Sequence, residues 1–582
     1  MKCTVTSSGR DSRPISGSGY KLASLAVGPI VNEFYTLQSI HGVRYENRTR
    51  DSGITTRGFT TKLTAPCKIN TNNTTNKYVS RGIILIFMKK PVDCVFVTVP
   101  YTDTIKPLMA PAILKSIATQ AGKTSVTIDL NRVFLNQFKT LPQNVQTKMI
   151  YFLKQEIWYN DQFVELVFDM FQQLAQKILA YSPKVVGISV FTYDCRVAAK
   201  YIAWMIKKID PSVKIIFGGA GIMYGLNQKA VFAETLQKSG LIDFFIYGDG
   251  EKSLYHYLTT SNEKFVGINR HAWLQLTNKE IEALPRPDYS DYDFSMYPSP
   301  EYYLPILGSR GCVRHCTFCD VHGHWEKFTY RSGQHIFEEM KYFKQEFGVK
   351  YFQFTDSLIN GNLREYRVMT QLLSDHNKDL PEEEKITWGG FFIFRAKSSF
   401  TERDWELTVN GGGRHLIVGI ETLNDQVRKD LGKNFTNDDI EYSFEMSQKY
   451  GSAMKFILLF ITGYPTETDA DYDFREKWFR ENVKYQDVIN SITVGTTLGI
   501  TENTPLWRDF DKLGLVKCGP SPEEWINPAN GNTLEKRLAW TDRMTKVVAD
   551  CGYLENKIGD QHYILERLKL KYEPMEQSQT VN

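Results

Sequence analysis

The sequence predicts an α/β protein with two parallel sheets, the first doubly wound and the second a partial (β/α)6 barrel, followed by a helical C-terminal extension. Three observations predict this fold. Apolar strands alternate with helices between about residues 92 and 260, six strand–helix repeats follow between 304 and about 495, and helical patterns mark residues 496–582. Such alternation is typical of parallel sheets whose faces are covered by helices.

Residues 1–87 form a basic tail before the first predicted strand. They are rich in Ser, Thr, Asn, Gly and Arg and show no sustained helix or strand period, which predicts disorder. Residues 1–80 contain eleven Lys or Arg against four Asp or Glu, so the net charge of +4 belongs to the tail and is no clear sign of nucleic-acid binding. Met88 begins the segment MKKPVDCVFVTVP, which looks like an ordinary N-terminus that runs into a first strand. A second hypothesis is therefore that translation begins at Met88 and that the preceding residues are a gene-model extension.

The doubly wound domain is predicted over residues 88–260. Its buried strands are CVFVTVP, TSVTIDL, PKVVGISVF, VKIIFGGAG and LIDFFIYGDG, with helices across 110–121 and 197–208. Glycines follow several of these strands at the carboxyl edge, where such sheets bind their ligands. The glycines are Gly187, Gly218, Gly219, Gly221, Gly248 and Gly250. As a group they predict close approach of the loops to one another or to a ligand.

A linker rich in Pro and Asp, residues 261–303, leads into the barrel domain, residues 304–495. The six barrel strands are LPILGS, KYFQFT, ITWGGFFIF, RHLIVGI, AMKFILLFI and VINSITVG, with helices expected at 332–347, 362–377, 401–410, 437–450 and 469–482. Six units predict a partial barrel and not a closed one of eight strands. Barrels of this kind carry their active sites at the carboxyl ends of the strands.

Composition limits the class of protein. The longest apolar runs, 82–88 and 456–461, are far too short to span a bilayer, and no secretory leader is recognisable, so no membrane association is expected. Six of the nine cysteines are scattered singly, which does not resemble a disulfide framework. Free thiols suit a reducing compartment, and a cytoplasmic location is expected.

The other three cysteines stand together in SRGCVRHCTFCDV, directly after the first barrel strand. Cys312, Cys316 and Cys319 have the spacing Cys-x3-Cys-x2-Cys. Three thiolates on one loop suit a 4Fe–4S cluster and leave one of its irons open to a substrate or cofactor. Two other interpretations stay open: a chance spacing, and a structural zinc ion with His322 or His324 as the fourth ligand. Zinc sites usually pair two separate cysteine knuckles, and this chain has one.

With Phe318 directly before the last cysteine, this loop resembles that of the radical S-adenosylmethionine (radical SAM) enzymes. The resemblance covers about residues 92–510 and implies a Rossmann-like domain followed by a TIM-like radical SAM barrel. It implies a 4Fe–4S cluster held by Cys312, Cys316 and Cys319, and S-adenosyl-L-methionine (SAM) as cofactor. It also implies a reducing partner such as flavodoxin or ferredoxin, since an electron must cleave SAM to a 5′-deoxyadenosyl radical.

The resemblance assigns the adenosine end of SAM to residues at three strand ends. Phe318 and Ile461 are expected to pack against the adenine. Gly463 lets the backbone approach that ring, so a β-carbon there is expected to enter the adenine space, and Glu467 ends the same segment. Glu421, in the Gly-Ile-Glu of the fourth strand, is expected to accept hydrogen bonds from the ribose hydroxyls.

The methionine end is assigned to the second and third strands. Asp356 and Ser357 follow the second strand, where a carboxylate can pair with the methionine ammonium group. Here Thr355-Asp356-Ser357 replaces the Gly-Gly-Glu that is common in the family. Arg395 follows the third strand and suits the planar methionine carboxylate, with a solvated loop arginine as the other interpretation.

The preceding domain resembles the cobalamin-binding-type domain of one large branch of the family. The motifs that carry this resemblance are Val185–Ser189, Gly218-Gly219 and Gly248-Asp249-Gly250-Glu251. The cobalt-ligand motif Asp-x-His-x-x-Gly does not occur, so cobalamin is possible as a cofactor but not favoured. Without it, the loops at the strand ends are expected to be filled by their own bulky residues Tyr101, Phe191 and Tyr193.

The function predicted from the sequence is that of a radical SAM iron–sulfur enzyme acting on an unidentified substrate. Hydrogen abstraction followed by rearrangement or oxidation is expected without cobalamin, and methyl transfer with it. The catalytic residues toward that substrate are unknown. The alternative is a non-catalytic iron–sulfur binding or electron-transfer protein, which predicts a closed cluster and no adenosyl pocket. The residues at the strand ends argue against this alternative.

Overall fold

The computed structural model describes residues 89–102, 106–223, 231–270, 273–297, 303–451, 453–495, 497–502 and 504–553. All of them fall within one compact unit, residues 84–582. The predicted tail and the alternative start at Met88 lie outside the described residues, and so do residues 554–582 of the predicted C-terminal extension.

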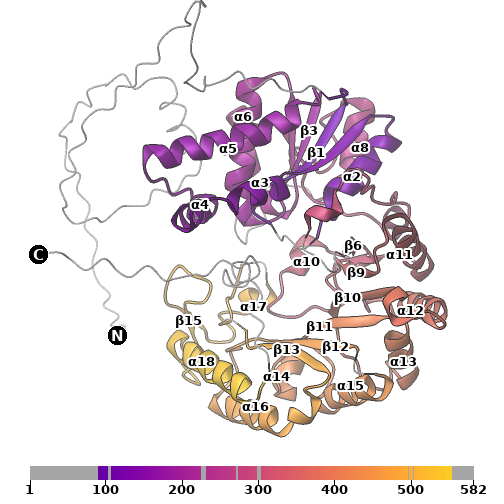
Figure 1. Ribbon diagram of the computed structural model, residues 1–582. Helices are drawn as coiled ribbons and strands as arrows, with labels where there is room; N and C mark the ends of the chain where they lie inside the picture. The colour runs from indigo at the N-terminus through magenta and orange to yellow at the C-terminus, as the bar shows by residue number, and fades with distance from the viewer. Residues whose placement is uncertain are drawn as a thin grey trace, which may run out of the picture. The chain divides into compact units, whose positions relative to one another are not determined.

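The first sheet has five parallel strands in the order β2-β1-β3-β4-β5 (Figure 1). Its strands are β1 (Cys94–Thr98), β2 (Ser125–Asp129), β3 (Val185–Ser189), β4 (Lys214–Gly218) and β5 (Phe244–Phe245). Every residue of β1 is buried, as expected for a parallel strand covered on both faces. The order confirms the doubly wound sheet. It also places the topological switch point, where such sheets bind ligands, between β1 and β3.

Helices α2 (Met109–Gln120), α6 (Arg196–Ile209), α7 (Val231–Lys238) and α8 (Gly250–Thr260) connect the strands, and α2 and α6 match the two predicted helices closely. Between β2 and β3 the chain forms three helices that the sequence pattern did not single out. They are α3 (Leu130–Phe138), α4 (Gln143–Gln155) and α5 (Asp161–Leu179). Aromatic packing holds α4 against its neighbours, because Phe152 contacts the rings of Phe163, Phe171 and Tyr201.

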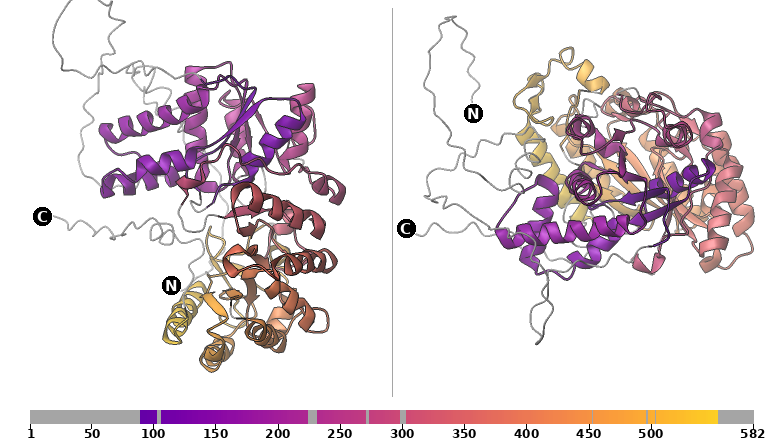
Figure 2. Two further views of the ribbon diagram at one scale, coloured as in Figure 1. Left: turned by 45° about the vertical axis from the view of Figure 1, so that its right-hand side comes forward. Right: turned by 90° about the horizontal axis from the view of Figure 1, so that it is seen from above.

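The second sheet has six strands in the order β13-β12-β11-β10-β9-β6, all paired in parallel. They are β6 (Leu304–Ile306), β9 (Tyr351–Phe354), β10 (Thr387–Phe392), β11 (Gly413–Glu421), β12 (Lys455–Phe460) and β13 (Ile489–Thr493). The main helices are α11 (Gly333–Phe347), α12 (Leu363–Asn377), α13 (Glu402–Asn410), α15 (Asn437–Tyr450) and α16 (Asp469–Glu481). They follow one another along one side of the curved sheet (Figure 2). Both the partial barrel and its five helices agree with the prediction.

The alternation of side chains along the barrel strands separates a helix-covered face from an inner face. In β12, Phe456, Leu458 and Phe460 are buried in the core under the helices, while the residues between them are half-buried on the other face. This period of two follows from the pleat of a β-strand. It decides which side chains at the strand ends face the helices and which face the inside of the barrel.

Short elements frame the cysteine loop and the C-terminal region. An antiparallel pair, β7 (Ser309–Arg310) and β8 (Thr329–Tyr330), closes the base of the cysteine loop, which contains α10 (Val321–His324). After β13 come α17 (Pro505–Arg508), a ribbon of β14 (Val516–Lys517) and β15 (Trp525–Ile526), and α18 (Leu534–Asp550). The described part of the C-terminal extension is thus less helical than predicted, because much of it consists of loops packed on the barrel.

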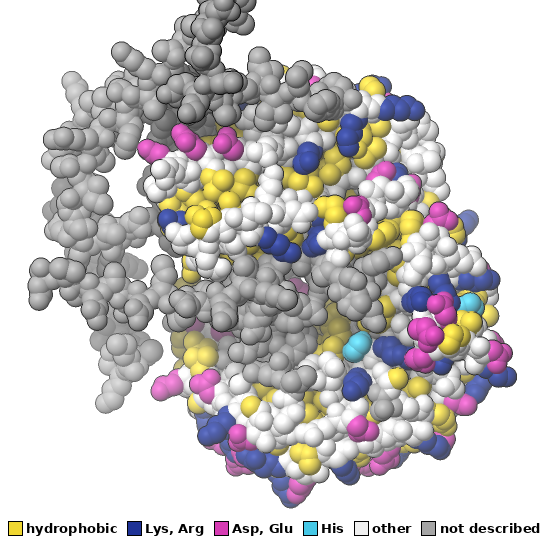
Figure 3. Space-filling view, viewed as in Figure 1, with side chains coloured by type: hydrophobic (Ala, Val, Ile, Leu, Met, Phe, Trp, Pro, Cys, Tyr) yellow, Lys and Arg dark blue, Asp and Glu magenta, His cyan; other side chains and the backbone are white. Residues whose placement is uncertain are grey.

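The described residues include no helix that is both long and apolar enough to cross a membrane. On the face of the molecule seen in Figure 3, basic and acidic side chains are interspersed over the barrel domain. Neighbouring charges of opposite sign largely cancel one another's field beyond a Debye length.

Candidate functional site

The cysteine loop, residues 311–328 between β7 and β8, places three thiols at the carboxyl end of the barrel sheet. Cys316 is buried, and Cys312 and Cys319 are partly buried. Burial raises the pKa of all three thiols, that of Cys319 to about 11. Lys433 acts in the opposite direction on Cys312 and Cys316, because a nearby cation stabilises a thiolate. The thiols are therefore protonated at neutral pH, and binding a metal cluster would release their protons.

The donor set fits an iron–sulfur cube better than a single ion. Within the described ranges, no three His, Cys, Asp or Glu side chains lie close enough together to bind one metal ion. A 4Fe–4S cube takes each thiolate at a different iron, so its ligands need not converge on one point. His322 bonds to the carbonyl of Arg314 and stacks on His315 with ring centres 3.9 Å apart. His324 lies 4.0 Å from Asp320.

Thr317 ties the centre of the loop to three other segments. Its N–H donates to the carbonyl of Leu431 at 3.0 Å, its carbonyl accepts from the N–H of Leu506 at 2.8 Å, and its hydroxyl lies 3.1 Å from that of Tyr464. Gly432 lies so close that a β-carbon there would be 3.4 Å from Cα of Cys316. The loop is therefore held by the segments that follow β11, β12 and β13.

Phe318 and Ile461, which are both predicted to pack against the adenine, lie in one apolar cluster. Both are partly buried against its core, which consists of Val427, Leu431, Tyr464, Leu498, Ile500, Leu506, Leu515 and Trp525. Five of those core residues come from the C-terminal extension. The sequence offered no signal for this contribution, because the extension carries no motif and its contacts are all tertiary.

The reason given for Gly463 needs correction. Its φ is +88°, and a β-carbon there would lie 2.0 Å from Cδ of Arg537 on α18. Arg537 is fully buried, with its guanidinium 3.8 Å from the ring centre of Trp525, and burial lowers its pKa to about 10. A side chain at residue 463 would therefore collide with Arg537 and would not enter a space left for adenine.

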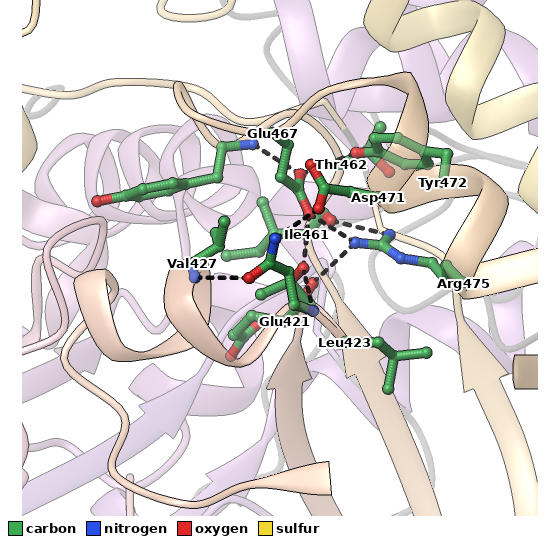
Figure 4. Close-up of polar contacts among 12 residues, drawn as sticks. Glu421, Leu423, Val427, Ile461, Thr462, Glu467, Asp471, Tyr472 and Arg475 are labelled. Atoms are coloured by element: carbon green, nitrogen blue, oxygen red, sulfur yellow. Dashed lines mark hydrogen bonds and ion pairs between the residues drawn. The ribbon is translucent and has the colours of Figure 1, made fainter.

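Glu467 has a structural role that the sequence did not indicate. It is almost fully buried at the centre of the polar network drawn in Figure 4. Its carboxylate accepts hydrogen bonds from the side chains of Thr422, Tyr472 and Arg475 and from the N–H groups of Gly463 and Tyr464. These bonds fix the turn after β12 to the end of β11, since Arg475 also donates to the carbonyl of Glu421.

Glu421 lies at the end of β11 in a conformation that is uncommon for a residue with a side chain. Its φ is +67°, and the pairing of β11 with β12 shifts register between Gly419 and Glu421. Strained backbone of this kind concentrates at functional sites. The buried carboxylate pairs with Lys433 at 2.6 Å, and the same ammonium group donates to the carbonyl of Gly419 at 2.5 Å. Lys433 is a site residue that the sequence did not single out.

Asp356 does not lie where the sequence placed it. Its side chain is on the same side as Phe352 and Phe354, which belong to the core under the helices. The carboxylate accepts a hydrogen bond from the Ser309 hydroxyl at 2.5 Å and another from the Gly308 N–H at 2.9 Å. Burial raises its pKa to about 7. Asp356 thus joins the end of β9 to the end of β6.

The neighbours of Asp356 are less buried than the aspartate itself. Thr355 is exposed and Ser357 is partly buried. The alternation along the strand puts both on the side opposite to Asp356. Of the predicted pair at this strand end, Ser357 therefore remains a candidate to face the cofactor, while the Asp356 carboxylate is already engaged by the protein.

Arg395 is a partly buried cation beside the cysteine loop. Its Nη2 donates to the carbonyls of Asn360 at 2.7 Å and Gly361 at 3.2 Å, and its Nε is buried without a hydrogen-bond partner. No carboxylate of the described residues forms an ion pair with it. Burial and the nearby Arg314 lower its pKa to about 10, while Cys312 raises it. These features suit a guanidinium that binds an anionic group of a ligand.

In the first sheet, the residues expected to fill the strand-end loops do so only in part. Tyr101 is buried, but Phe191 is 45% exposed and Tyr193 is 60% exposed. The glycines after β4 bring loops together: a β-carbon at Gly219 would lie 2.5 Å from the carbonyl oxygen of Val190. The expectation that their own bulky residues fill these loops is therefore wrong for two of the three aromatic residues.

Comparison with known proteins places the second sheet in a family. Residues 306–477 match the radical SAM superfamily. Anaerobic magnesium-protoporphyrin IX monomethyl ester cyclase from Synechocystis sp. is 23% identical over 52% of this chain and 60% of its own length. Cytidylyl-2-hydroxyethylphosphonate methyltransferase from Streptomyces wedmorensis is 23% identical over 34% of this chain and 39% of its own length. The chain thus spans less than two thirds of the length of these relatives.

Two solved structures share the fold across both sheets. One is the radical SAM methyltransferase TsrM from Kitasatospora setae with cobalamin and a 4Fe–4S cluster bound, with a TM-score of 0.55, 14% identity, and coverage of 82% of this chain and 95% of that one. The other is the cobalamin-dependent SAM radical enzyme OxsB, with a TM-score of 0.54, 13% identity, and coverage of 83% and 69%. Residues 306–477 of this chain therefore match the radical SAM superfamily, and the chain shares the fold of TsrM and OxsB.

Proposed function

We propose that this protein is a radical SAM enzyme in which Cys312, Cys316 and Cys319 hold a 4Fe–4S cluster and the carboxyl end of the barrel sheet binds SAM. A radical SAM domain uses both cofactors. When bound, they supply a 5′-deoxyadenosyl radical after one-electron reduction, which here would come from a partner such as flavodoxin or ferredoxin. We propose no particular substrate and no overall reaction beyond the formation of this radical.

The observation that carries this proposal is the position of Arg395. Its guanidinium is close enough to Cys312 for the two to affect each other's charge, its Nε is unpartnered, and it binds only carbonyl oxygens in the described structure. A buried cation without an anion is costly, and the methionine carboxylate of SAM would satisfy it with a planar, two-point contact. Arg395 would then orient the methionine group beside the cysteine loop.

Glu421 and Lys433 would serve the ribose. The carboxylate of Glu421 is buried and is held by Lys433 at 2.6 Å, which fixes its direction. Its remaining lone pairs can accept hydrogen bonds from a ribose diol. Phe318 and Ile461, in their shared apolar cluster, would cover the adenine and exclude water from the radical. Arg537 occupies the space beside Gly463.

The test is the formation of 5′-deoxyadenosine. The full chain, reconstituted with iron and sulfide without oxygen and reduced with dithionite, is expected to bind SAM and to release 5′-deoxyadenosine and methionine. A non-catalytic iron–sulfur protein is expected to take up the cluster but to leave SAM intact. Chromatography of the quenched reaction separates the two. If the protein takes up the cluster but leaves SAM uncleaved, the proposed enzymatic activity is refuted.

A second candidate activity is methyl transfer through cobalamin, and one observation favours it. Phe191 and Tyr193 stand exposed in the loop after β3, at the switch point between β1 and β3. Exposed aromatic side chains at the ligand-binding edge of a doubly wound sheet suit a large flat cofactor. TsrM and OxsB share the fold and are described with cobalamin bound. Without the Asp-x-His-x-x-Gly motif, the lower face of the corrin would be open or would contact a group other than histidine.

Retention of hydroxocobalamin tests this second candidate. The reconstituted protein is expected to keep about one corrin per chain after desalting, because the two aromatic side chains would lose exposed apolar surface on binding. The double variant Phe191→Ser, Tyr193→Ser is expected to keep much less, while Tyr255→Ser, an exposed tyrosine on α8, serves as the control. If the wild-type protein keeps no corrin after desalting, cobalamin takes no part in the reaction.

A further inference from the structure

The motif Gly248-Asp249-Gly250-Glu251 lies against the base of the cysteine loop. Arg310, two residues before Cys312, points its guanidinium at both acids. Its Nη2 lies 2.5 Å from Oε1 of Glu251, and its Nη1 lies 3.2 Å from Oε2 of Glu251 and 2.9 Å from Oδ1 of Asp249. All three side chains are largely buried, with 13%, 6% and 4% of Arg310, Glu251 and Asp249 exposed.

Asp249 also contacts the other side of the loop. The indole N–H of Trp325, six residues after Cys319, donates to the same Oδ1 of Asp249 at 3.4 Å. Gly311 brings the two sides together, because a β-carbon there would lie 3.1 Å from Cβ of Trp325. The second oxygen of Asp249 accepts from the N–H of Leu276 at 2.7 Å, which fixes the carboxylate within its own domain.

Further bonds join the same two parts of the chain. The segment around α9 (Asn278–Glu282) lies along the outgoing side of the loop. Lys327 N–H donates to the side chain of Gln275 at 3.2 Å, Tyr330 N–H donates to that of Asn278 at 3.1 Å, and Ser332 N–H donates to that of Glu282 at 2.8 Å. Both stems of the cysteine loop are therefore bound by the chain that follows β5.

We infer that Asp249 and Glu251 are positioning residues for the cluster, acting through Arg310 and Trp325 on the two stems of the cysteine loop. This rests on the proposed function in one respect, that the loop holds a cluster. Two residues span at most about 7 Å, so a movement of Arg310 is passed directly to Cys312. The doubly wound domain thereby acts on the iron site itself, besides any cofactor that it binds.

Stability alone does not account for this arrangement. Removing two carboxylates and a guanidinium from water is expensive, and apolar residues of similar size often stabilise a buried contact as well as an ion pair does. A charged, two-point contact adds direction, since the guanidinium accepts only a narrow range of carboxylate orientations. Fixed direction is what three thiolates need if they are to meet three corners of one cube.

The experiment compares Glu251→Gln with Glu156→Gln in the full chain. Glu156 forms a similarly buried ion pair with Lys200, at 2.5 Å, in the same domain, and also accepts a hydrogen bond from Tyr201 there. Hydrogen exchange of metal-free protein is followed over residues 309–330. Glu251→Gln is expected to speed exchange there about tenfold, because the loop opens locally, while Glu156→Gln leaves it unchanged.

The same variants are then reconstituted. In Glu251→Gln the electron paramagnetic resonance spectrum of the reduced cluster is expected to change and to respond less to SAM, and Arg310→Lys is expected to fall between it and the wild type. If Glu251→Gln does not fold, Trp325→Phe removes the indole N–H together with the pyrrole part of the ring and should still speed loop exchange. Wild-type exchange and spectra in the folded variants would overturn the inference. A wild-type chain that takes up no iron would instead count against the proposed function, and the exchange result would still decide whether these residues position the loop.

Discussion

Replacing any one of Cys312, Cys316 and Cys319 by alanine is expected to abolish a stable 4Fe–4S cluster and with it all cleavage of SAM. The cube has four irons and three protein thiolates, so one iron is already open. A second iron without a thiolate leaves the cube bound at two corners only. The expected result is loss of most of the iron per chain, of the visible absorption of the cluster and of its electron paramagnetic resonance signal.

The remaining cysteines provide matched controls. Cys518 is exposed and Cys551 is partly buried, both in the C-terminal extension. Cys518→Ala and Cys551→Ala are expected to keep the iron content and the rate of 5′-deoxyadenosine formation of the wild type. Loss of the cluster in Cys518→Ala, or a full cluster in Cys316→Ala, would contradict the assignment of three ligands. A protein that binds about one zinc and no iron would favour the structural zinc site instead.

Replacing Arg395 by methionine is expected to abolish SAM binding while the cluster stays intact. Truncating one partner of a buried charge pair costs about 2–5 kcal/mol, which is roughly thirtyfold to a few thousandfold in affinity. Methionine keeps the volume of the stem, so the loss measures the guanidinium. Binding is read from equilibrium dialysis with labelled SAM and from the change that SAM causes in the spectrum of the reduced cluster.

Two further variants make this result specific. Arg395→Lys keeps the charge but loses the planar fork, so it is expected to recover only part of the affinity. Arg367 already has a carboxylate partner in Asp404, with its Nε at 2.6 Å, and Arg367→Met is therefore expected to leave SAM binding near that of the wild type. Undiminished binding in Arg395→Met would place the methionine carboxylate elsewhere in the site.

The sequence determined the two parallel sheets because their signals are local. Short apolar strands, helices with a regular apolar period and glycines between them recur at short intervals. The structure places the barrel helices within about a residue of the prediction. The spacing of Cys312, Cys316 and Cys319 is a local signal as well. The resemblance to the radical SAM superfamily could therefore be predicted from the sequence alone, and the match over residues 306–477 confirms it for that part of the chain.

The tertiary structure decided what each strand-end residue contacts. Asp356 and Ser357 are neighbours in the chain, yet the strand pleat turns one toward the helices and leaves the other for the site. Gly463 matches its motif, but its missing side chain is explained by Arg537, 74 residues later. No sequence motif indicates which residues Lys433, Arg310 and Asp249 contact. Contacts between residues distant in sequence depend on how the segments pack, and one sequence without its fold does not carry that information.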